Sequence, residues 1–174
     1  MNKTALLSLA LALLLGTNHC AAKTPISLCT KSELEVFNCK FKTKSLSLCG
    51  TANSKTLSST LQYRFGLANK IELTYPKIAQ EPSSNFWYSR TAYSGGGEQR
   101  VHFKNRQYDY ILYDRTVRTG FGNGPNNPEF SSGLIIKKLG KITSTQKCSN
   151  DNQINIPNGM MIPEEEFDCS IDFE

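Results

Sequence analysis

Hydrophobic and polar residues alternate one by one through the middle of the chain. The stretches LQYRFG (61–66), IELTYP (71–76) and RVHFK (100–104) each place an apolar side chain at every second position, and QYDYILYD (107–114) is rich in aromatic and aliphatic residues. A period of two with aromatic and β-branched residues is typical of strands that bury one face. The pattern therefore predicts a half-buried β-sheet.

Four further stretches bring the set to about eight candidate strands, namely 39–49, 85–94, 133–138 and 141–148. Turn signals such as GLANK (66–70), KNRQ (104–107) and LGK (139–141) separate neighbours, which favours hairpins in antiparallel order. Apart from a short turn around TKSELEVF (30–37), no stretch has the pattern of an amphipathic helix. We expect an all-β fold, either a small antiparallel β-barrel or a strongly bent meander sheet stapled by disulfides.

Two segments interrupt the alternating pattern. The stretch 119–133 is dense in Gly, Asn and Pro, which predicts a long surface loop. The stretch 149–174 has prolines, few strand signals and a run of acidic residues, which predicts an irregular acidic tail. Since no internal repeat is present, we expect one β-barrel-like domain at 23–148 followed by this tail.

The first 22 residues have the composition of a secretory signal peptide. Lys3 precedes a Leu- and Ala-rich run, 5–15, that is too short to span a bilayer. Cleavage after Ala22 places Cys20 and Ala22 at the −3 and −1 positions. The polar residues just before Cys20 favour this cleavage over a lipid-modified Cys20. We therefore expect an exported, periplasmic protein without a membrane span.

Removal of the signal peptide leaves five cysteines: Cys29, Cys39, Cys49, Cys148 and Cys169. In an exported protein an odd number indicates disulfides with one free thiol or one intermolecular bridge. Metal binding is disfavoured, because no two cysteines have CxxC spacing and histidine is scarce. We expect one bridge within the set Cys39, Cys49 and Cys148, and a second bridge between Cys29 and Cys169.

Charge is distributed unevenly along the chain. Residues 23–147 carry 19 basic and 8 acidic side chains, a net charge of +11, whereas the residues after Lys147 carry seven acidic side chains and no Lys or Arg. Such asymmetry is typical of an interaction tail or of a tail that folds back on its own body, and Cys169 near the end favours the second. In an exported protein the basic body suits anionic wall polymer or lipopolysaccharide better than nucleic acid.

Catalytic groups are scarce in the mature chain. His102 is its only histidine and lies at a polar position of an alternating strand, where an exposed side chain is typical. No serine has the context of a nucleophile elbow, and Glu98, Asp109 and Asp114 form a carboxylate pair only if the fold gathers them. We expect a protein that is not an enzyme and uses no metal or cofactor. An enzyme that uses Glu98, His102 and nearby carboxylates is the alternative to a binding protein.

Three consecutive glycines, Gly95, Gly96 and Gly97, follow an aromatic strand that ends in Tyr93 and Ser94. Bare backbone is needed in a tight turn or bulge, in an anion-binding loop, or in a finger that enters a partner. An anion-binding loop would lead into a helix N-terminus, whereas these glycines lead into the strand EQRVHF (98–103). All three interpretations stay open, and the turn and the finger are favoured over the anion-binding loop.

A cysteine-bearing first strand (FNC, 37–39), the Ser-Gly loop and a late cysteine strand (QKC, 146–148) resemble the bacterial periplasmic inhibitors of c-type lysozyme. That resemblance implies a small antiparallel barrel that pushes a Ser-Gly loop into the cleft of the enzyme, where it hydrogen-bonds the catalytic carboxylates. Carried over to this chain, the contact residues are Ser94 and Gly95, with Tyr93 as support. The loop of the family continues to a tyrosine where this chain has Glu98.

Two classes of partner follow from these observations. In the first hypothesis the loop 94–98 binds a peptidoglycan-degrading enzyme, a muramidase or an amidase, as a lysozyme inhibitor or a toxin immunity protein would. The positive body suits an acidic enzyme better than a basic one. Arg115, Arg118 and the loop that follows them are expected to form a second contact surface beside the glycines. In the alternative hypothesis the protein is a cell-envelope module whose basic face holds anionic wall polymer.

Overall fold

The computed structural model describes residues 27–120, 122, 124 and 127–171, so the expected signal peptide at 1–22 lies outside the described residues. The described part contains strands and one 3-10 turn: β1 (Leu34–Lys40), β2 (Ser45–Asn53), β3 (Ser58–Leu67), β4 (Lys70–Gln80), η1 (Pro82–Ser84), β5 (Trp87–Tyr93), β6 (Gly96–Asn105), β7 (Tyr108–Val117), β8 (Glu129–Lys138) and β9 (Lys141–Lys147). No helix in this part is long and apolar enough to cross a membrane.

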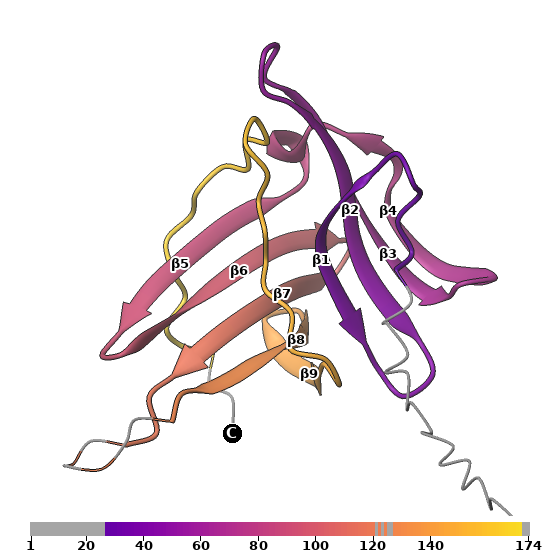
Figure 1. The fold of residues 1–174 in the computed structure, drawn as a ribbon. Coiled ribbons are helices and arrows are strands. Elements are labelled where there is room, and N and C mark those ends of the chain that lie inside the picture. The colour runs from indigo at the N-terminus through magenta and orange to yellow at the C-terminus, as the bar shows by residue number, and fades with distance from the viewer. Residues whose placement is uncertain (1–26, 121, 123, 125–126, 172–174) are drawn as a thin grey trace, which may run out of the picture.

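The strands form two antiparallel meander sheets (Figure 1). Sheet A has the order β1-β2-β3-β4, and sheet B has the order β5-β6-β7-β8-β9. The all-β class and the antiparallel neighbour order are confirmed, but among the described strands no ladder joins the two sheets, so the expected barrel is not closed. Between β4 and β5 the chain passes through the 3-10 turn η1, where Pro82 supplies no backbone N–H for a ladder.

Two boundaries differ from the sequence-based expectation. The stretch 39–49, expected as one strand, is the hairpin of β1 and β2, and β1 begins within the expected turn at 30–37. Residues 36–39 of β1 are all buried, because the strand is covered on both faces, and this removes the alternation that marks a half-buried strand. The loop expected at 119–133 ends earlier, since β8 already begins at Glu129.

An aromatic cluster joins the inner faces of the two sheets. The ring of Phe103 on β6 stacks on Tyr110 of β7 and on Tyr75 of β4, with centroids 4.7 Å apart in both pairs. Tyr63 of β3 lies 4.9 Å from Phe103, and Phe86 lies 5.6 Å from it on an edge. Because the rings come from both sheets, burial of this cluster holds the sheets against each other.

The C-terminal segment, residues 148–171, which we call the strap, first covers the free edge of sheet A. Its backbone N–H groups at Ser149 and Asn155 donate to the β1 carbonyls of Lys40 and Val36, each at 2.8 Å. Asn150 extends this pairing through its side chain, which accepts a hydrogen bond from the Lys40 N–H at 2.7 Å. The strap therefore occupies an edge that would otherwise expose unpaired backbone groups.

The strap then returns along the free edge of sheet B (Figure 1, orange to yellow). Tyr88 of β5 donates to the Pro163 carbonyl and accepts from the Glu165 N–H, both at 2.8 Å. The strap also contributes Ile154 and Met160 to the main core. The tail thus folds back onto the body, as Cys169 had suggested, although the thiol itself plays no part in the anchoring.

Two disulfides join the segment before β1 and the start of the strap to sheet A. Cys39 of β1 bonds Cys148 at the start of the strap, within the expected set, and Cys29 bonds Cys49 of β2. The expected bridge between Cys29 and Cys169 is wrong, since Cys169 is exposed and free. Structural disulfides are typical of proteins that fold in an oxidising compartment.

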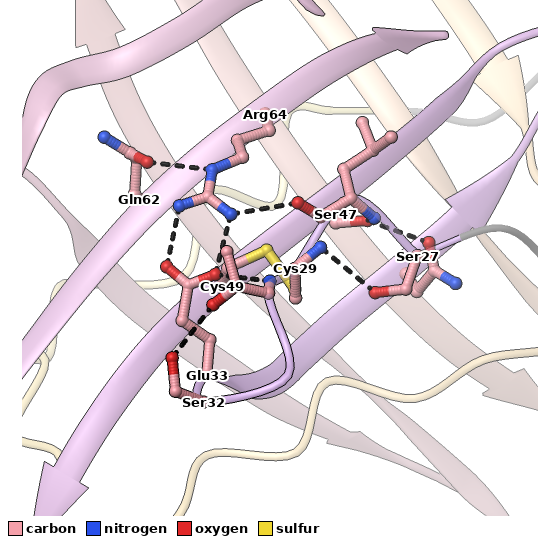
Figure 2. Close-up of a disulfide and its surroundings, with 11 residues drawn as sticks. Ser27, Cys29, Ser32, Glu33, Ser47, Cys49, Gln62 and Arg64 are labelled. Carbon is pink, nitrogen blue, oxygen red and sulfur yellow. Dashed lines mark hydrogen bonds and ion pairs between the residues drawn. A yellow bond between two sulfur atoms is a disulfide. The ribbon is translucent and has the colours of Figure 1, made fainter. Parts of the chain in front are cut away.

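A charged clamp explains why Cys29 pairs with β2 (Figure 2). The guanidinium of Arg64 donates to both carboxylate oxygens of Glu33, at 2.6 and 2.7 Å, and to the Leu28 carbonyl at 2.9 Å. This fork lowers the pKa of the Glu33 carboxyl, mainly through the hydrogen bond from Arg64. The clamp holds residues 28–33 over sheet A, and so places Cys29 beside Cys49 rather than near the end of the strap.

We expect the two disulfides to contribute unequally to stability. Changing Cys39 and Cys148 to alanine removes a bridge that closes a loop with a sequence separation of 109. Changing Cys29 and Cys49 to alanine removes a bridge with a sequence separation of only 20. On the chain-entropy model the free energy of unfolding should fall by about 5 kcal/mol and about 3 kcal/mol respectively. Urea unfolding of both double variants measures this. Equal losses would contradict the expectation.

Candidate binding site at the β5–β6 hairpin

The glycine-rich stretch forms a tight hairpin turn at one end of sheet B. Tyr93 of β5 pairs with Gly96 of β6, which leaves Ser94 and Gly95 as a two-residue turn. Both turn residues are exposed. Gly95 has a φ of +88°, a conformation that residues with a Cβ rarely adopt and glycine adopts without penalty.

The next glycine serves close packing rather than the turn. A Cβ at Gly96 would lie 2.0 Å from the carbonyl oxygen of Thr116 on β7, so no other residue fits there without moving the strand. Gly97 is less constrained, because a Cβ there would lie 3.0 Å from the Thr91 carbonyl oxygen. The triplet thus answers two needs, a positive φ at Gly95 and a close strand approach at Gly96.

Glu98 lies directly behind the turn on the outer face of sheet B, and its carboxylate is buried there. Its side chain has no exposed surface and accepts a hydrogen bond from Arg100 Nε at 2.5 Å and from the Tyr93 hydroxyl at 2.6 Å. Arg115 Nε lies 3.8 Å from the same carboxylate, and the Arg115 guanidinium lies over the Tyr93 ring. Burial, followed by the hydrogen bond to Glu98, raises the pKa of Tyr93 to about 12. The network therefore locks the base of the turn.

Arg115 and Arg118 are brought beside the hairpin, as expected. Arg115 of β7 is the register partner of Glu98. The aliphatic part of Arg118 runs against the turn, since a Cβ at Gly95 would lie 2.9 Å from Arg118 Cδ. The structure thus gathers Tyr93, Ser94, Gly95, Arg115 and Arg118 at one end of sheet B.

The loop after Arg118 leaves the same end of sheet B as the turn, because β5–β6 and β7–β8 are successive antiparallel hairpins. Within it, Thr119 donates from its hydroxyl to the Asn127 carbonyl. Residues 121, 123, 125 and 126 of this loop lie outside the described residues.

The strap supports the hairpin from the outer face of sheet B. Arg100 donates to the Asp168 carbonyl at 2.7 Å, and its guanidinium lies 4.0 Å from the centre of the Phe167 ring. Sequence reasoning did not predict this cover. Two features of the sequence could have indicated it. Glu98, Arg100 and His102 are spaced two apart and so share one face of a strand, and the tail after Lys147 is acidic and could bind the basic members of that face.

His102 also contacts the strap. Its Nδ1 lies 3.1 Å from a Glu165 oxygen and its Nε2 lies 3.4 Å from an Asp109 oxygen, with the Trp87 ring 5.5 Å away. Asp114, by contrast, accepts a hydrogen bond from the Ile154 N–H at 2.6 Å, and burial raises the pKa of its carboxyl. Two of the polar groups considered for catalysis, His102 and Asp114, thus bind the strap. Within the described ranges, no three His, Cys, Asp or Glu side chains are grouped to hold a metal ion.

Neutralising Glu98 should destabilise the whole domain. In Glu98→Gln the buried Arg100 loses its ionic partner, and we expect the free energy of unfolding to fall by about 3 kcal/mol. Glu129→Gln, an exposed carboxylate on β8 of the same sheet, is the matched control and should change it by less than about 0.5 kcal/mol. Urea unfolding compares the two, and equal midpoints would show that the buried pair does not hold the hairpin.

Acid should loosen the end of the strap. Hydrogen bonds from Ser170, followed by the Lys137 ammonium, lower the pKa of Asp168 to about 2 from an ordinary 3.8. A lowered carboxyl pKa stabilises the folded state above the unfolded value, and this stabilisation is lost as the pH falls through the range between the two values. Amide hydrogen exchange at Glu165 and Ser170, corrected for its intrinsic pH dependence, should speed up over that range.

The control for this experiment is a second carboxylate on the strap. Asp168→Asn should remove the acid transition, whereas Asp151→Asn, at an exposed strap position, should preserve it. A transition that persists in Asp168→Asn would contradict the assignment to Asp168.

Comparison with known proteins adds no family to this description. No family model, no curated protein and no solved structure matches the chain. The similarity to lysozyme inhibitors therefore stays an expectation based on the residues that carry it.

Proposed function

We propose that this is an exported, periplasmic binding protein that blocks a peptidoglycan-degrading enzyme with the tip of the β5–β6 hairpin. The observation that carries the proposal is the exposed Ser94–Gly95 turn fixed on a buried ionic network. A turn that only reverses the chain does not need such a base. A turn that enters a cleft gains from it, because a preorganised loop loses little conformational entropy on binding.

The chemistry of the tip suits the active site of a glycoside hydrolase. Such enzymes act with a pair of carboxylates that face each other across the cleft. The Ser94 hydroxyl and the N–H groups of the turn are donors for carboxylate oxygens. Arg115 and Arg118 flank the turn and add positive charge, which complements an acidic cleft. Glu98 acts in this proposal as a positioning residue, since its carboxylate has no exposed surface.

Inhibition assays with the oxidised mature protein test the proposal. Hydrolysis of peptidoglycan by a panel of muramidases and amidases is followed by loss of turbidity. At least one enzyme should be inhibited, and Ser94→Trp should weaken this inhibition by more than about tenfold, because a bulky side chain at the tip cannot enter the cleft. Gln107→Trp in the β6–β7 turn, at the other end of β6 and also exposed, should leave it unchanged.

Three outcomes would count against the enzyme-blocking function. The first is that no enzyme of the panel is inhibited, and the second is that both tryptophan variants lose inhibition equally. The third is retention of isolated wall polymer that salt releases and that Ser94→Trp does not affect, which would favour the cell-envelope module instead.

A further inference from the structure

A groove opens between the two sheets beside the Cys39–Cys148 disulfide. It lies between the β1–β2 turn, the end of β3 and the end of β9, and has a volume of about 670 Å³. Phe41 and Phe65 form one of its walls, with their rings edge to face at 6.1 Å. Both rings are only partly buried, so the groove offers aromatic surface to a ligand.

An apolar recess of about 180 Å³ adjoins the groove between the inner faces of the sheets. Phe65 and Gln146 line both spaces. Leu73 of β4, Leu134 and Ile136 of β8, and the rings of Tyr63 and Tyr110 line the recess. The recess is therefore mainly apolar and suits a hydrocarbon chain.

The mouth of the groove is cationic. Lys42, Lys44 and Lys147 line it and no carboxylate does. Lys44 is paired with Glu72 at 2.7 Å, and its ammonium lies 5.4 Å from the centre of the Phe65 ring. Lys42 and Lys147 are exposed, and neither is bound to a carboxylate within the described part of the chain. Two ammonium groups thus stand at the entrance of an apolar recess.

We propose that this groove binds a fatty acid anion, with the acyl chain in the recess and the carboxylate at Lys42 and Lys147. A mainly apolar interior with a cationic rim disfavours a cationic amphiphile by charge. It favours an anion with a hydrocarbon chain over a small hydrophilic anion, which has no apolar surface to bury. No residue of the groove belongs to the β5–β6 hairpin, so the site is independent of the proposed enzyme-blocking tip.

Titration calorimetry with saturated fatty acids from octanoate to hexadecanoate, below their micelle concentrations, tests the site in the oxidised mature protein. Affinity should rise by about fourfold for each added methylene until the recess is filled. Dodecyltrimethylammonium, with the same chain and the opposite charge, should bind at least about tenfold more weakly than dodecanoate.

Two sets of variants locate the ligand. Lys42→Glu with Lys147→Glu should lower the affinity for dodecanoate by more than about tenfold. Lys55→Glu with Lys141→Glu changes the net charge equally at exposed positions outside the groove and should alter the affinity by less than about twofold. Leu73→Trp should fill the recess and remove the dependence on chain length, and Ser94→Trp should bind dodecanoate as the unmodified protein does.

The site is overturned if dodecanoate produces no saturable heat, if the cationic amphiphile binds equally well, or if both lysine pairs weaken binding alike. Lysophosphatidylglycerol is the last arm of the test. Tighter binding of this lipid than of the fatty acid with the same chain would overturn the fatty acid as the ligand in favour of a phosphate head group. None of these results depends on whether the hairpin inhibits an enzyme.

Discussion

The hydrogen bonds between the strap and the two sheet edges are the constraint on which the rest of the structure depends. An open meander exposes unpaired backbone groups at each end strand, and here one segment covers β1 of sheet A and β5 of sheet B in turn. The same segment supplies core residues and places Phe167 and Asp168 against Arg100. The Glu98–Arg100 pair is buried only because this cover is present, so the rigidity of the hairpin turn is a property of the chain end as much as of the hairpin.

Local patterns were sufficient to predict most of the strands. Alternation identified β3, β4, β6 and β7, because each buries one face against the aromatic cluster. It did not separate β1 from β2, since residues 36–39 are buried on both faces and show no period. Local patterns also could not predict whether the strands close into a barrel, because closure depends on pairing between strands that are far apart in the sequence.

The candidate site shows the same division between local and long-range information. The turn at Gly95 follows from the glycines themselves, and the positions of Arg115 and Arg118 follow from hairpin register. The burial of Glu98 did not follow, because a polar residue on the polar face of a strand is normally exposed. Its burial depends on long-range contacts, such as the hydrogen bond from Arg100 to the carbonyl of Asp168, 68 positions further along the chain.

The register of the first hairpin has a consequence for how the correct cysteines find each other. Three cysteines, Cys29, Cys39 and Cys49, leave the ribosome long before Cys148. In the β1–β2 ladder Cys39 stands opposite Leu46, three residues from Cys49. At about 3.3 Å per residue this separates the two thiol-bearing positions by about 10 Å along the strands, beyond the reach of a disulfide of about 7 Å between Cα atoms. Once this hairpin has formed, its register keeps Cys39 out of reach of Cys49 and leaves it available for Cys148.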